Sequence, residues 1–365
     1  MNSLGFDKKK QDTKVVVAMS GGVDSSVAAA MLKKEGYDVL GITLRLYNQG
    51  RVNKSKSCCA GQDIEDAKKI AKQFDFPHFV YDYQDKFYSG VIDNFVETYA
   101  KGETPVPCIK CNQTVKFHDL LNEAKKNKAD TLVTGHYARR IGNQNSKLFK
   151  AVDKNKDQSY FLFATLRDQL DYIRFPLGDY LKSEIRDIAK ELNLKVQNKP
   201  DSQDICFVTT NSYRDLLNAL RPDLNIPGNF LDMKGNIIGK HKGITNYTVG
   251  QRKGLGIGGY KDPLYVININ KKENSVYLGE EKFLQKSIVY LRNVNWLSEK
   301  NIKSKIKCSA KIRSTQQEAP GILEFNDKYC TFTFDERITS TSPGQACVFY
   351  LKDQVLGGGW ITKSI

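Results

Sequence analysis

The first half of the chain alternates short apolar runs with amphipathic stretches. Lys14–Ala18 is mostly valine, as expected for a strand that is buried on both faces of a parallel sheet. The alanine-rich segment 25–34 stops just before Gly36, which is typical of a helix and its C-terminal cap. Further strands are predicted over 39–46, 79–81 and 131–134, and further helices over 64–74 and 116–126. This alternation predicts an α/β fold with an open, mostly parallel sheet covered by helices on both faces.

The pattern changes near residue 209, where one more helix, predicted over 212–220, precedes a stretch rich in proline and glycine turns. Closely spaced strands then follow, which indicates a small β-barrel or sandwich. They are predicted over 265–269, 275–278, 303–313, 329–334 and 346–351. We therefore expect an N-terminal tail over 1–13, an α/β domain over 14–209, a small central domain over 210–285 and a C-terminal β-barrel over 286–365.

The chain is basic: it carries 56 lysines and arginines against 41 aspartates and glutamates, a formal net charge of +15. Such an excess favours a polyanionic partner such as nucleic acid, although a lysine-rich solvated surface would give the same sum. In the predicted strand 303–313, basic and apolar residues alternate, so that one face carries the charges and either contacts phosphates or is simply solvated. The basic residues are Lys303, Lys305, Lys307, Lys311 and Arg313, with Ile302, Ile306, Cys308, Ala310 and Ile312 between them.

The sequence also excludes some classes of protein. No stretch approaches the roughly 18 apolar residues that a membrane helix requires. The first twelve residues contain no apolar segment of the kind that a signal peptide needs. We therefore expect a cytoplasmic protein without membrane contact, and its eight cysteines are expected to be thiols rather than a disulfide framework.

The segment Ser20-Gly21-Gly22-Val23-Asp24-Ser25-Ser26 lies between the first predicted strand and the first predicted helix. Its glycines let backbone N–H groups approach an anion, while the serine hydroxyls and the helix N-terminus add further donors. No Gly-Lys-Ser/Thr follows, so it is not a Walker A loop. We interpret it as a cradle for the pyrophosphate that leaves during adenylation; the simpler alternative is that Asp24 or Ser25 only caps the helix. The segment resembles the SGGxDS loop of the ATP pyrophosphatases, which activate a carbonyl oxygen as its AMP ester.

Three cysteines have surroundings unlike those of a protein core. Cys108 and Cys111 form a C-x-x-C motif just before a predicted helix. A cysteine near a helix N-terminus has a lowered pKa, so we expect Cys111 to be available as a thiolate. Cys206 closely follows the polar run 201–204. Three others lie in predicted strands and are expected in the core: Cys308, Cys330 and Cys347.

Two metal sites compete with a catalytic role for these thiols. Structural zinc would need a second pair of ligands, for which the chain offers only the adjacent Cys58 and Cys59. A [4Fe–4S] cluster stays open, because three thiolates can hold a cluster with one free iron. Its ligands would be Cys108, Cys111 and Cys206.

One of the four histidines has a suggestive position. His136 directly follows the predicted strand 131–134, at the carboxyl edge where ligands bind in such sheets. A lone histidine is as often structural, so both interpretations stay open.

Seven segments together resemble the bacterial tRNA-specific 2-thiouridylases (the MnmA family of PP-loop enzymes), in that family's order and spacing. They run nearly from end to end: AMSGGVDSSVAA, TPVPCIKCNQTVKF, GHYAR, KDQSYFL, SQDICF, YTVGQRKGLGIGG and SPGQACVFY. The resemblance implies a PP-loop ATP-binding catalytic domain, a small central domain and a C-terminal β-barrel that binds tRNA. It also implies that the C2 oxygen of the wobble uridine is replaced by sulfur, with release of AMP and diphosphate.

The resemblance also implies roles for particular residues. Cys111 matches the family's catalytic nucleophile and Cys206 the cysteine that carries a persulfide, while many members carry aspartate where this chain has Cys108. The positions that match ATP contacts are Ala18, Met19, Ser20, Gly21, Gly22, Val23, Asp24, Ser25, Leu44 and Gly135. Those that match contacts to the target base or tRNA are Val106, Pro107, Cys108, His136, Lys156, Asp157, Gln158, Arg313, Ser314 and Gln345.

The implied cofactors are ATP and Mg²⁺, with the iron–sulfur cluster as an open addition. The implied partners are tRNA and a protein sulfur donor, either a sulfur-relay protein or a cysteine desulfurase. Two other classes of function stay open. One is a PP-loop ligase or amidating enzyme that acts on a small metabolite, and the other is a non-catalytic RNA-binding protein with a metal-stabilised C-x-x-C.

Overall fold

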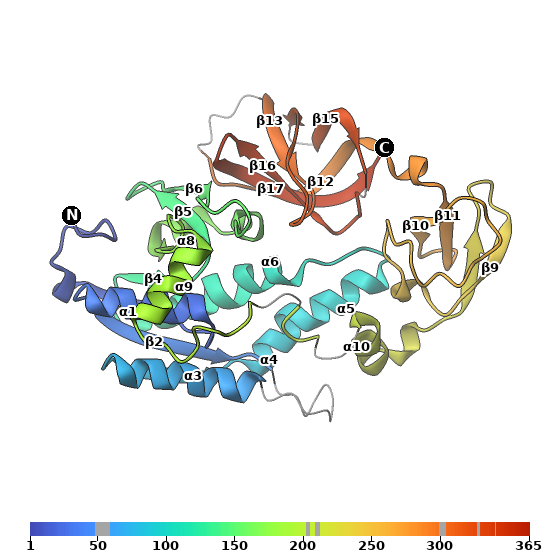
Figure 1. Ribbon diagram of the computed structural model, residues 1–365. Helices are drawn as coiled ribbons and strands as arrows, with labels where there is room; N and C mark the ends of the chain where they lie inside the picture. The colour runs from blue at the N-terminus through green and yellow to red at the C-terminus, as the bar shows by residue number, and fades with distance from the viewer. Residues whose placement is uncertain (48–58, 202–204, 209–211, 299–303, 327–328, 340) are drawn as a thin grey trace. The chain divides into compact units, whose positions relative to one another are not determined.

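The computed structural model describes residues 1–47, 59–201, 205–208, 212–298, 304–326, 329–339 and 341–365 (Figure 1). The chain forms two compact units. Unit 1 consists of Met1–Val91, Cys108–Phe207 and Asp353–Val355, and unit 2 of Ile92–Pro107, Val208–Lys352 and Leu356–Ile365. The zinc alternative on Cys58 and the proposed face residues Ile302 and Lys303 lie outside the described residues.

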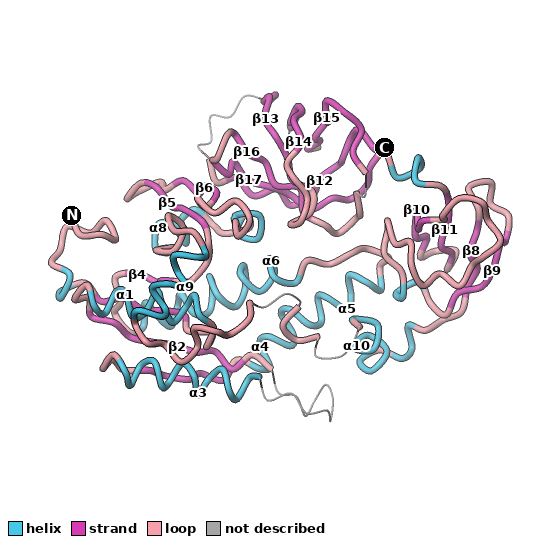
Figure 2. Tube along the Cα trace, viewed as in Figure 1, coloured by secondary structure: helices cyan, strands magenta, loops and turns pink. Residues whose placement is uncertain are grey.

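Unit 1 is built on a parallel sheet of five strands, as the alternating pattern predicted (Figure 2). The order across the sheet is β3-β2-β1-β4-β7. Every pairing in this sheet is parallel, so the carboxyl ends of the strands meet at one edge. The strands are β1 (Lys14–Ala18), β2 (Asp38–Arg45), β3 (His78–Asp82), β4 (Thr131–Val133) and β7 (Ile173–Arg174).

Apolar side chains bury both faces of this sheet. Val15 and Val17 point to one face and belong to a core shared with α1 (Val23–Lys34), α3 (Cys59–Gln73) and α9 (Lys182–Glu191). Val16 points to the opposite face and is also fully buried. Burial on both faces explains why the strand is a continuous apolar run rather than an alternating one.

The helix predicted over 116–126 is present but begins earlier than expected. The sequence placed Cys108 and Cys111 just before this helix. Instead, α6 (Pro107–Cys111) begins at the second proline and continues into a π-helix, η3 (Asn112–Leu120), and then α7 (Leu121–Lys126). Proline is compatible with a first helical turn, because its missing N–H would have no partner there. Cys108 and Cys111 therefore lie on a helix rather than before one.

Several further elements of unit 1 were not predicted from the sequence. A hairpin of β5 (Ala138–Ile141) and β6 (Lys147–Lys150) is antiparallel, and Gln354 and Val355 extend it by pairing with β6. The remaining helical segments are η1 (Lys10–Asp12), α4 (Gln84–Phe87), η2 (Tyr88–Ile92), η4 (Ser159–Leu162) and α8 (Arg167–Tyr172).

Unit 2 contains a small sheet of four strands in the order β10-β11-β8-β9. Phe230, Val266 and Val276 from three of these strands share a core. The strands are β8 (Gly228–Leu231), β9 (Ile237–His241), β10 (Tyr265–Asn270) and β11 (Ser275–Gly279). The helical segments of unit 2 are α5 (Asp93–Ala100), α10 (Tyr213–Leu220), η5 (Pro222–Leu224), η6 (Ile244–Asn246) and η7 (Glu281–Leu284).

The last strands of unit 2 form the predicted β-barrel. They follow one another in the order β12-β15-β14-β13-β16-β17, and antiparallel pairing between β12 and β17 closes the barrel. Cys308, Cys330 and Cys347 lie in its core, which confirms their assignment as core residues. The strands are β12 (Lys286–Trp296), β13 (Lys305–Lys311), β14 (Ala319–Phe325), β15 (Cys330–Ile338), β16 (Ala346–Leu351) and β17 (Gln354–Ser364). Across the described residues, no helix combines the length and apolar character needed to cross a membrane.

Candidate active site

The serine- and glycine-rich loop joins the end of β1 to the start of α1. The Ser20 backbone N–H donates to the Ser25 hydroxyl at 3.1 Å, and the two serine hydroxyls lie 3.1 Å apart. The loop therefore curls back onto the first turn of the helix. The buried hydroxyl of Ser26 has no hydrogen-bond partner among the residues that the structure describes. Free donors in a tight turn at a helix N-terminus fit the phosphates of a nucleotide.

Two glycines in contact with this loop leave no room for a side chain. Gly21 has φ +74°, and a β-carbon there would lie 2.1 Å from the Asp63 carbonyl oxygen. Gly135, just after β4, approaches the loop from the neighbouring strand, and a β-carbon there would lie 2.8 Å from the Ser25 backbone nitrogen. The structure thus brings together Gly135 and Ser25, two residues that the sequence had assigned to one ATP site.

Asp24 does not serve as the cap of α1, which the sequence left as an alternative. The N-cap residue is Gly22, and no side chain caps this helix. The Asp24 carboxylate instead accepts hydrogen bonds from Lys182 Nζ at 2.6 Å and from the Tyr137 hydroxyl at 2.8 Å. Burial, followed by the charge of Asp24, raises the pKa of Tyr137, so its hydroxyl stays a donor.

Lys182 belongs to a network of charges that the sequence did not reveal. Its ammonium also lies 3.0 Å from Asp201, which accepts from Lys156 at 2.8 Å and from Arg186 at 2.9 Å. Burial opposes ionisation of Asp201, but the hydrogen bonds from Lys156 and Lys182 outweigh it and lower its pKa to about 2. Lys182 and Arg186 lie one turn apart on α9, but Lys156 and Asp24 come from other parts of the chain, so no local pattern could have revealed the whole network.

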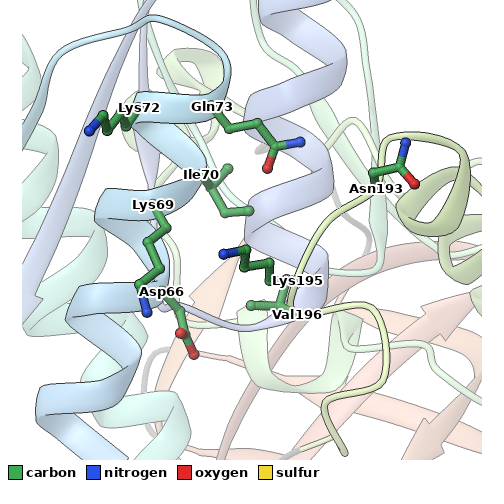
Figure 3. Close-up of a pocket in the computed structure, with 8 residues that line it drawn as sticks. All are labelled: Asp66, Lys69, Ile70, Lys72, Gln73, Asn193, Lys195 and Val196. Atoms are coloured by element: carbon green, nitrogen blue, oxygen red, sulfur yellow. The ribbon is translucent and has the colours of Figure 1, made fainter.

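A second lysine, Lys199, contacts the loop at its first glycine, Gly21. Lys199 Nζ donates to the Gly21 carbonyl at 2.9 Å and to Asp63 and Asp66 on α3 at 2.5 and 2.9 Å. Asp66 also lines an open cavity of about 560 Å³ between α3 and the segment after α9. Figure 3 shows Asp66 on α3 among the residues that line this cavity. The cavity is lined by Asp66, Lys69, Ile70, Lys72, Gln73, Asn193, Lys195 and Val196, and it contains none of the predicted site residues.

The three candidate cysteines share one electrostatic environment in unit 1. Cys206 as a whole residue is exposed, but desolvation of its thiol, followed by the nearby thiols of Cys111 and Cys108, raises its pKa to about 12. Lys116 acts in the opposite direction on all three thiols. The three cysteines and Lys116 are therefore neighbours, and Lys116 is a site residue that we had not singled out.

The prediction that Cys111 has a lowered pKa is wrong. Burial raises the pKa of Cys111 above its usual value, and the positive charge of Lys116 offsets only part of this effect. The sequence argument assumed that Cys111 stands at a helix N-terminus. In fact Cys111 is the last residue of α6 and the helical path continues past it, so no free N-terminal dipole stabilises the thiolate.

The described residues form no evident metal site. Among the residues that the structure describes, no three His, Cys, Asp or Glu side chains are grouped so that they could hold a metal ion. Cys108, Cys111 and Cys206 are free thiols that do not form a preformed cluster site.

His136 lies just after β4 and contacts the helical segment that follows the C-x-x-C motif. Its ring lies 5.9 Å from Phe117 and 6.2 Å from Phe175, centroid to centroid, and its Nδ1 lies 2.9 Å from the Thr134 hydroxyl. Burial, with a smaller effect of Lys116, lowers the pKa of His136 well below its usual value, so the ring is neutral at neutral pH. His136 therefore packs as a neutral ring between β4 and η3.

The next predicted residues shape the loop that follows β6. Asp157 accepts from the Ala151 backbone and from both donors of Ser159, while Gln158 accepts from the Tyr137 backbone at 2.9 Å. Leu44 is half-buried near the carboxyl end of β2 and pairs with Tyr81 of β3. Ala18 and Met19 end β1 and begin the loop.

The remaining predicted residues belong to unit 2 and are described there alone. The Arg313 guanidinium donates to the Val249 carbonyl at 3.3 Å, and the Gln345 amide donates to the Thr104 carbonyl at 3.4 Å. Ser314 follows β13 in a turn. Val106 and Pro107 lead into α6, with Val106 half-buried and Pro107 buried.

These features define a class of protein. The α/β domain has a parallel sheet, a lysine-free phosphate loop after its first strand, and free cysteines nearby. This combination is typical of a PP-loop ATP-using enzyme. Three family models match in succession: "tRNA methyl transferase HUP domain" over residues 13–210, "tRNA methyl transferase PRC-barrel domain" over 214–280 and "Aminomethyltransferase beta-barrel domain" over 286–361.

Curated relatives narrow the class to one family. The tRNA-specific 2-thiouridylase MnmA of Rhodospirillum centenum is 49% identical, covering 100% of this chain and 95% of the relative. The protein of the same name from Orientia tsutsugamushi is 50% identical over 99% of this chain and 98% of the relative. The chain belongs to the tRNA-specific 2-thiouridylase family. NMN synthetase from Francisella tularensis is similar at 17% identity over 58% of this chain and 77% of that one, with a TM-score of 0.34, which is too low to establish a shared fold.

Proposed function

We propose that the protein is an ATP-dependent tRNA sulfurtransferase that replaces the C2 oxygen of the wobble uridine with sulfur. One observation carries the proposal: the consecutive residues Gly135 and His136 touch both halves of the site. Gly135 abuts the Ser25 backbone of the phosphate loop, and His136 packs on Phe117, the residue after Lys116. Lys116 in turn acts on the thiols. These links support our assignment of the nucleotide loop and the thiols to one site in unit 1.

The first step is activation of the uridine by ATP. The C2 oxygen attacks the α-phosphorus, the bond to the β,γ-pyrophosphate breaks, and the N3 proton leaves the base. The loop from Ser20 to Ser25 holds the departing pyrophosphate through its backbone N–H groups and hydroxyls, and Mg²⁺ carried by the phosphates assists. Once AMP is attached to the C2 oxygen, that oxygen can leave as part of AMP, whereas oxide alone is too poor a leaving group.

The second step delivers sulfur. A protein sulfur donor loads Cys206 as a persulfide, whose terminal sulfur attacks C2 while the C2–O bond to AMP breaks. Cys111 must first lose its proton, because burial raises its pKa. Its sulfur then attacks the Cys206 sulfur, which leaves the terminal sulfur on the base and joins the two cysteines in a disulfide. If Cys111 acts before C2 is attacked, it frees the same sulfur as sulfide, with the same products. In either order, two electrons from an external thiol reductant restore both thiols.

Unit 2 supports tRNA binding through its charge. Lys305 and Lys307 of β13 are exposed and alternate with buried or half-buried Ile306 and Cys308, so one face of the strand is basic. Lys305 already pairs with Glu324 at 2.5 Å, which reduces its share in phosphate binding. We assign the tRNA contacts of unit 2 to this face together with Arg313, Ser314 and Gln345. We assign 14–209 to the catalytic domain, 210–285 to the central domain and 286–365 to the tRNA-binding barrel.

The test is to incubate the purified, reduced protein with unmodified tRNA, ATP, Mg²⁺ and a protein sulfur donor that itself carries a persulfide, and to digest the tRNA for nucleoside mass spectrometry. We expect 2-thiouridine at the wobble position, together with AMP and diphosphate. Formation of AMP from a small substrate without RNA would instead indicate a PP-loop ligase. Absence of nucleotide turnover under all conditions would favour a non-catalytic RNA-binding protein. Anaerobic purification with an iron and sulfide assay tests the cluster in the same preparation.

A further inference from the structure

The peptide unit between Gly21 and Gly22 is the part of the phosphate loop that sterics constrain least. Neither residue has a β-carbon, so the clashes that fix other peptide units do not prevent this one from rotating as a whole. Its direction matters, because the C=O and the N–H of a trans peptide point to opposite sides. With the N–H turned toward a phosphate the loop attracts the anion, and with the C=O turned there the loop repels it.

Lys199 holds this peptide unit in one orientation. Its ammonium donates to the Gly21 carbonyl at 2.9 Å. It also donates to the carboxylates of Asp63 at 2.5 Å and Asp66 at 2.9 Å, both on α3. Its three hydrogens thus have three acceptors, and none is left over for a phosphate. The Gly22 N–H consequently points away from Lys199, and no backbone carbonyl among the described residues accepts a hydrogen bond from it.

The backbone of Lys199 is itself held in place. Its N–H donates to the Val196 carbonyl at 2.9 Å, and its carbonyl accepts from the Arg186 guanidinium of α9 at 3.4 Å. Burial disfavours the charged ammonium, but the hydrogen bonds to Asp63 and Asp66 outweigh it and raise the pKa of Lys199. The contact with the loop is therefore made by a fixed donor that stays charged at neutral pH.

The charges around Lys199 argue against a direct role in attracting phosphate. Its single positive charge faces the two carboxylates of Asp63 and Asp66, so the three side chains together are negative. A group of this sign repels a polyphosphate. Any contribution of Lys199 to nucleotide binding must therefore come from the shape that it gives the loop.

We propose that Lys199 is a positioning residue that keeps the N–H of the Gly21–Gly22 peptide unit turned toward the β- and γ-phosphates of ATP. Without its ammonium the peptide unit rotates, and conformers that present a carbonyl to the phosphates compete with the binding conformer. The loss of affinity is confined to the two phosphates that the loop holds. This inference rests on the ATP site proposed above.

The experiment compares two nucleotides by isothermal titration calorimetry on the full chain without tRNA. α,β-Methylene-ATP with Mg²⁺ carries all three phosphates and resists cleavage after the first, whereas AMP lacks the two that the loop is assigned to hold. If the binding conformer falls to about a tenth of the population in Lys199→Met, the Kd of the analogue rises roughly tenfold and that of AMP stays within about twofold. A residue that only stabilises the fold would weaken both nucleotides alike.

Lys195→Met is the matched control. It removes the same charge from the same segment, but the ammonium of Lys195 is not the partner of Asp63 or Asp66. We expect this variant to keep the affinity of the unaltered chain for both nucleotides. Asp66→Asn tests the same idea without touching Lys199 or the loop, and it should raise the Kd of the analogue by about threefold, because the ammonium is held less firmly.

Two results would overturn the inference. They are an unchanged preference for the analogue over AMP in Lys199→Met, and an equal loss of affinity for both nucleotides in that variant. If Lys199→Met does not fold, Asp66→Asn decides, and an unchanged preference there overturns the inference as well. The unaltered chain separates the two proposals: if it does not bind the analogue more tightly than AMP, the phosphate loop itself is wrongly assigned, whereas a preference that survives the variants refutes only the role of Lys199.

Discussion

Gly135 stands so close to Ser25 that no side chain fits between them, although the two residues come from different strand–loop connections of the sheet. A β-carbon on Gly135 would stand 2.8 Å from the Ser25 backbone nitrogen and 3.0 Å from the Asp24 carbonyl carbon. Both neighbours are backbone atoms, which cannot rotate away as the end of a side chain can. The shape of the phosphate loop therefore depends on the absence of a side chain on the adjacent strand connection.

Gly135→Ala should consequently impair ATP binding. The added methyl group must displace the backbone of the loop at the first turn of α1, where the N–H groups would meet the phosphates. We expect the Kd for ATP to rise at least roughly tenfold, as for a misplaced set of binding groups. Gly61→Ala is the control, because a β-carbon at Gly61 meets no atom within 4 Å. Isothermal titration calorimetry measures both, and equal affinities would contradict the assigned loop.

Cys111→Ser and Cys206→Ser should each abolish thiolation while tRNA binding stays close to normal. Serine cannot carry a persulfide or form the disulfide, so we expect a loss of at least about a thousandfold in 2-thiouridine formation. Nucleoside mass spectrometry measures the product, and filter binding measures the affinity for tRNA. Substantial thiolation by either variant, given a protein sulfur donor, would refute the assigned roles.

Cys108→Ser separates the persulfide mechanism from a cluster. If Cys108 only neighbours the reacting thiols, the variant should lose less than roughly tenfold in activity. If the three cysteines hold a [4Fe–4S] cluster, the variant should lose a cluster ligand, its iron and its activity together. The deciding measurement is the iron content of anaerobically prepared protein beside its rate of thiolation.

The structural features that could be predicted from the sequence are those that depend on short local patterns of residues. The valines of 15–17 predicted a buried strand, because only a sheet covered on both faces needs such a run. The hairpin of β5 and β6 was missed because charged residues such as Arg139 and Lys147 interrupt any apolar alternation. The pair between Asp24 and Lys182 joins residues 158 positions apart, so only the fold could show it. The predicted lowering of the Cys111 pKa was wrong because the helix was expected to begin after Cys111 and because the sequence does not show that this thiol is buried.

The raised pKa of Cys206 predicts an unusual pH dependence for its alkylation. The thiolate is the reactive form, and a pKa of about 12 keeps the thiol protonated across the neutral range. The rate in the free enzyme should therefore climb steadily with pH and reach no plateau up to about pH 10. In the urea-unfolded chain the same cysteine should level off above its ordinary pKa of about 8.5. Peptide-resolved alkylation at a series of pH values checks this, and a folded-state plateau near pH 9 would contradict the buried environment.

The two exposed lysines of β13 should contribute unequally to tRNA binding. Lys305 is paired with Glu324, whereas Lys307 makes no ion pair within the part of the chain that the structure describes. A lysine that contacts phosphate releases about one counterion, so Lys307→Gln should make the slope of log K against log salt shallower by about 0.9. Lys305→Gln is the matched control on the same face, and it should change the slope much less, because its charge is already largely neutralised by Glu324. The slopes come from filter binding at several salt concentrations. Equal slopes for Lys307→Gln and the unaltered chain would exclude this face of the barrel as a phosphate contact.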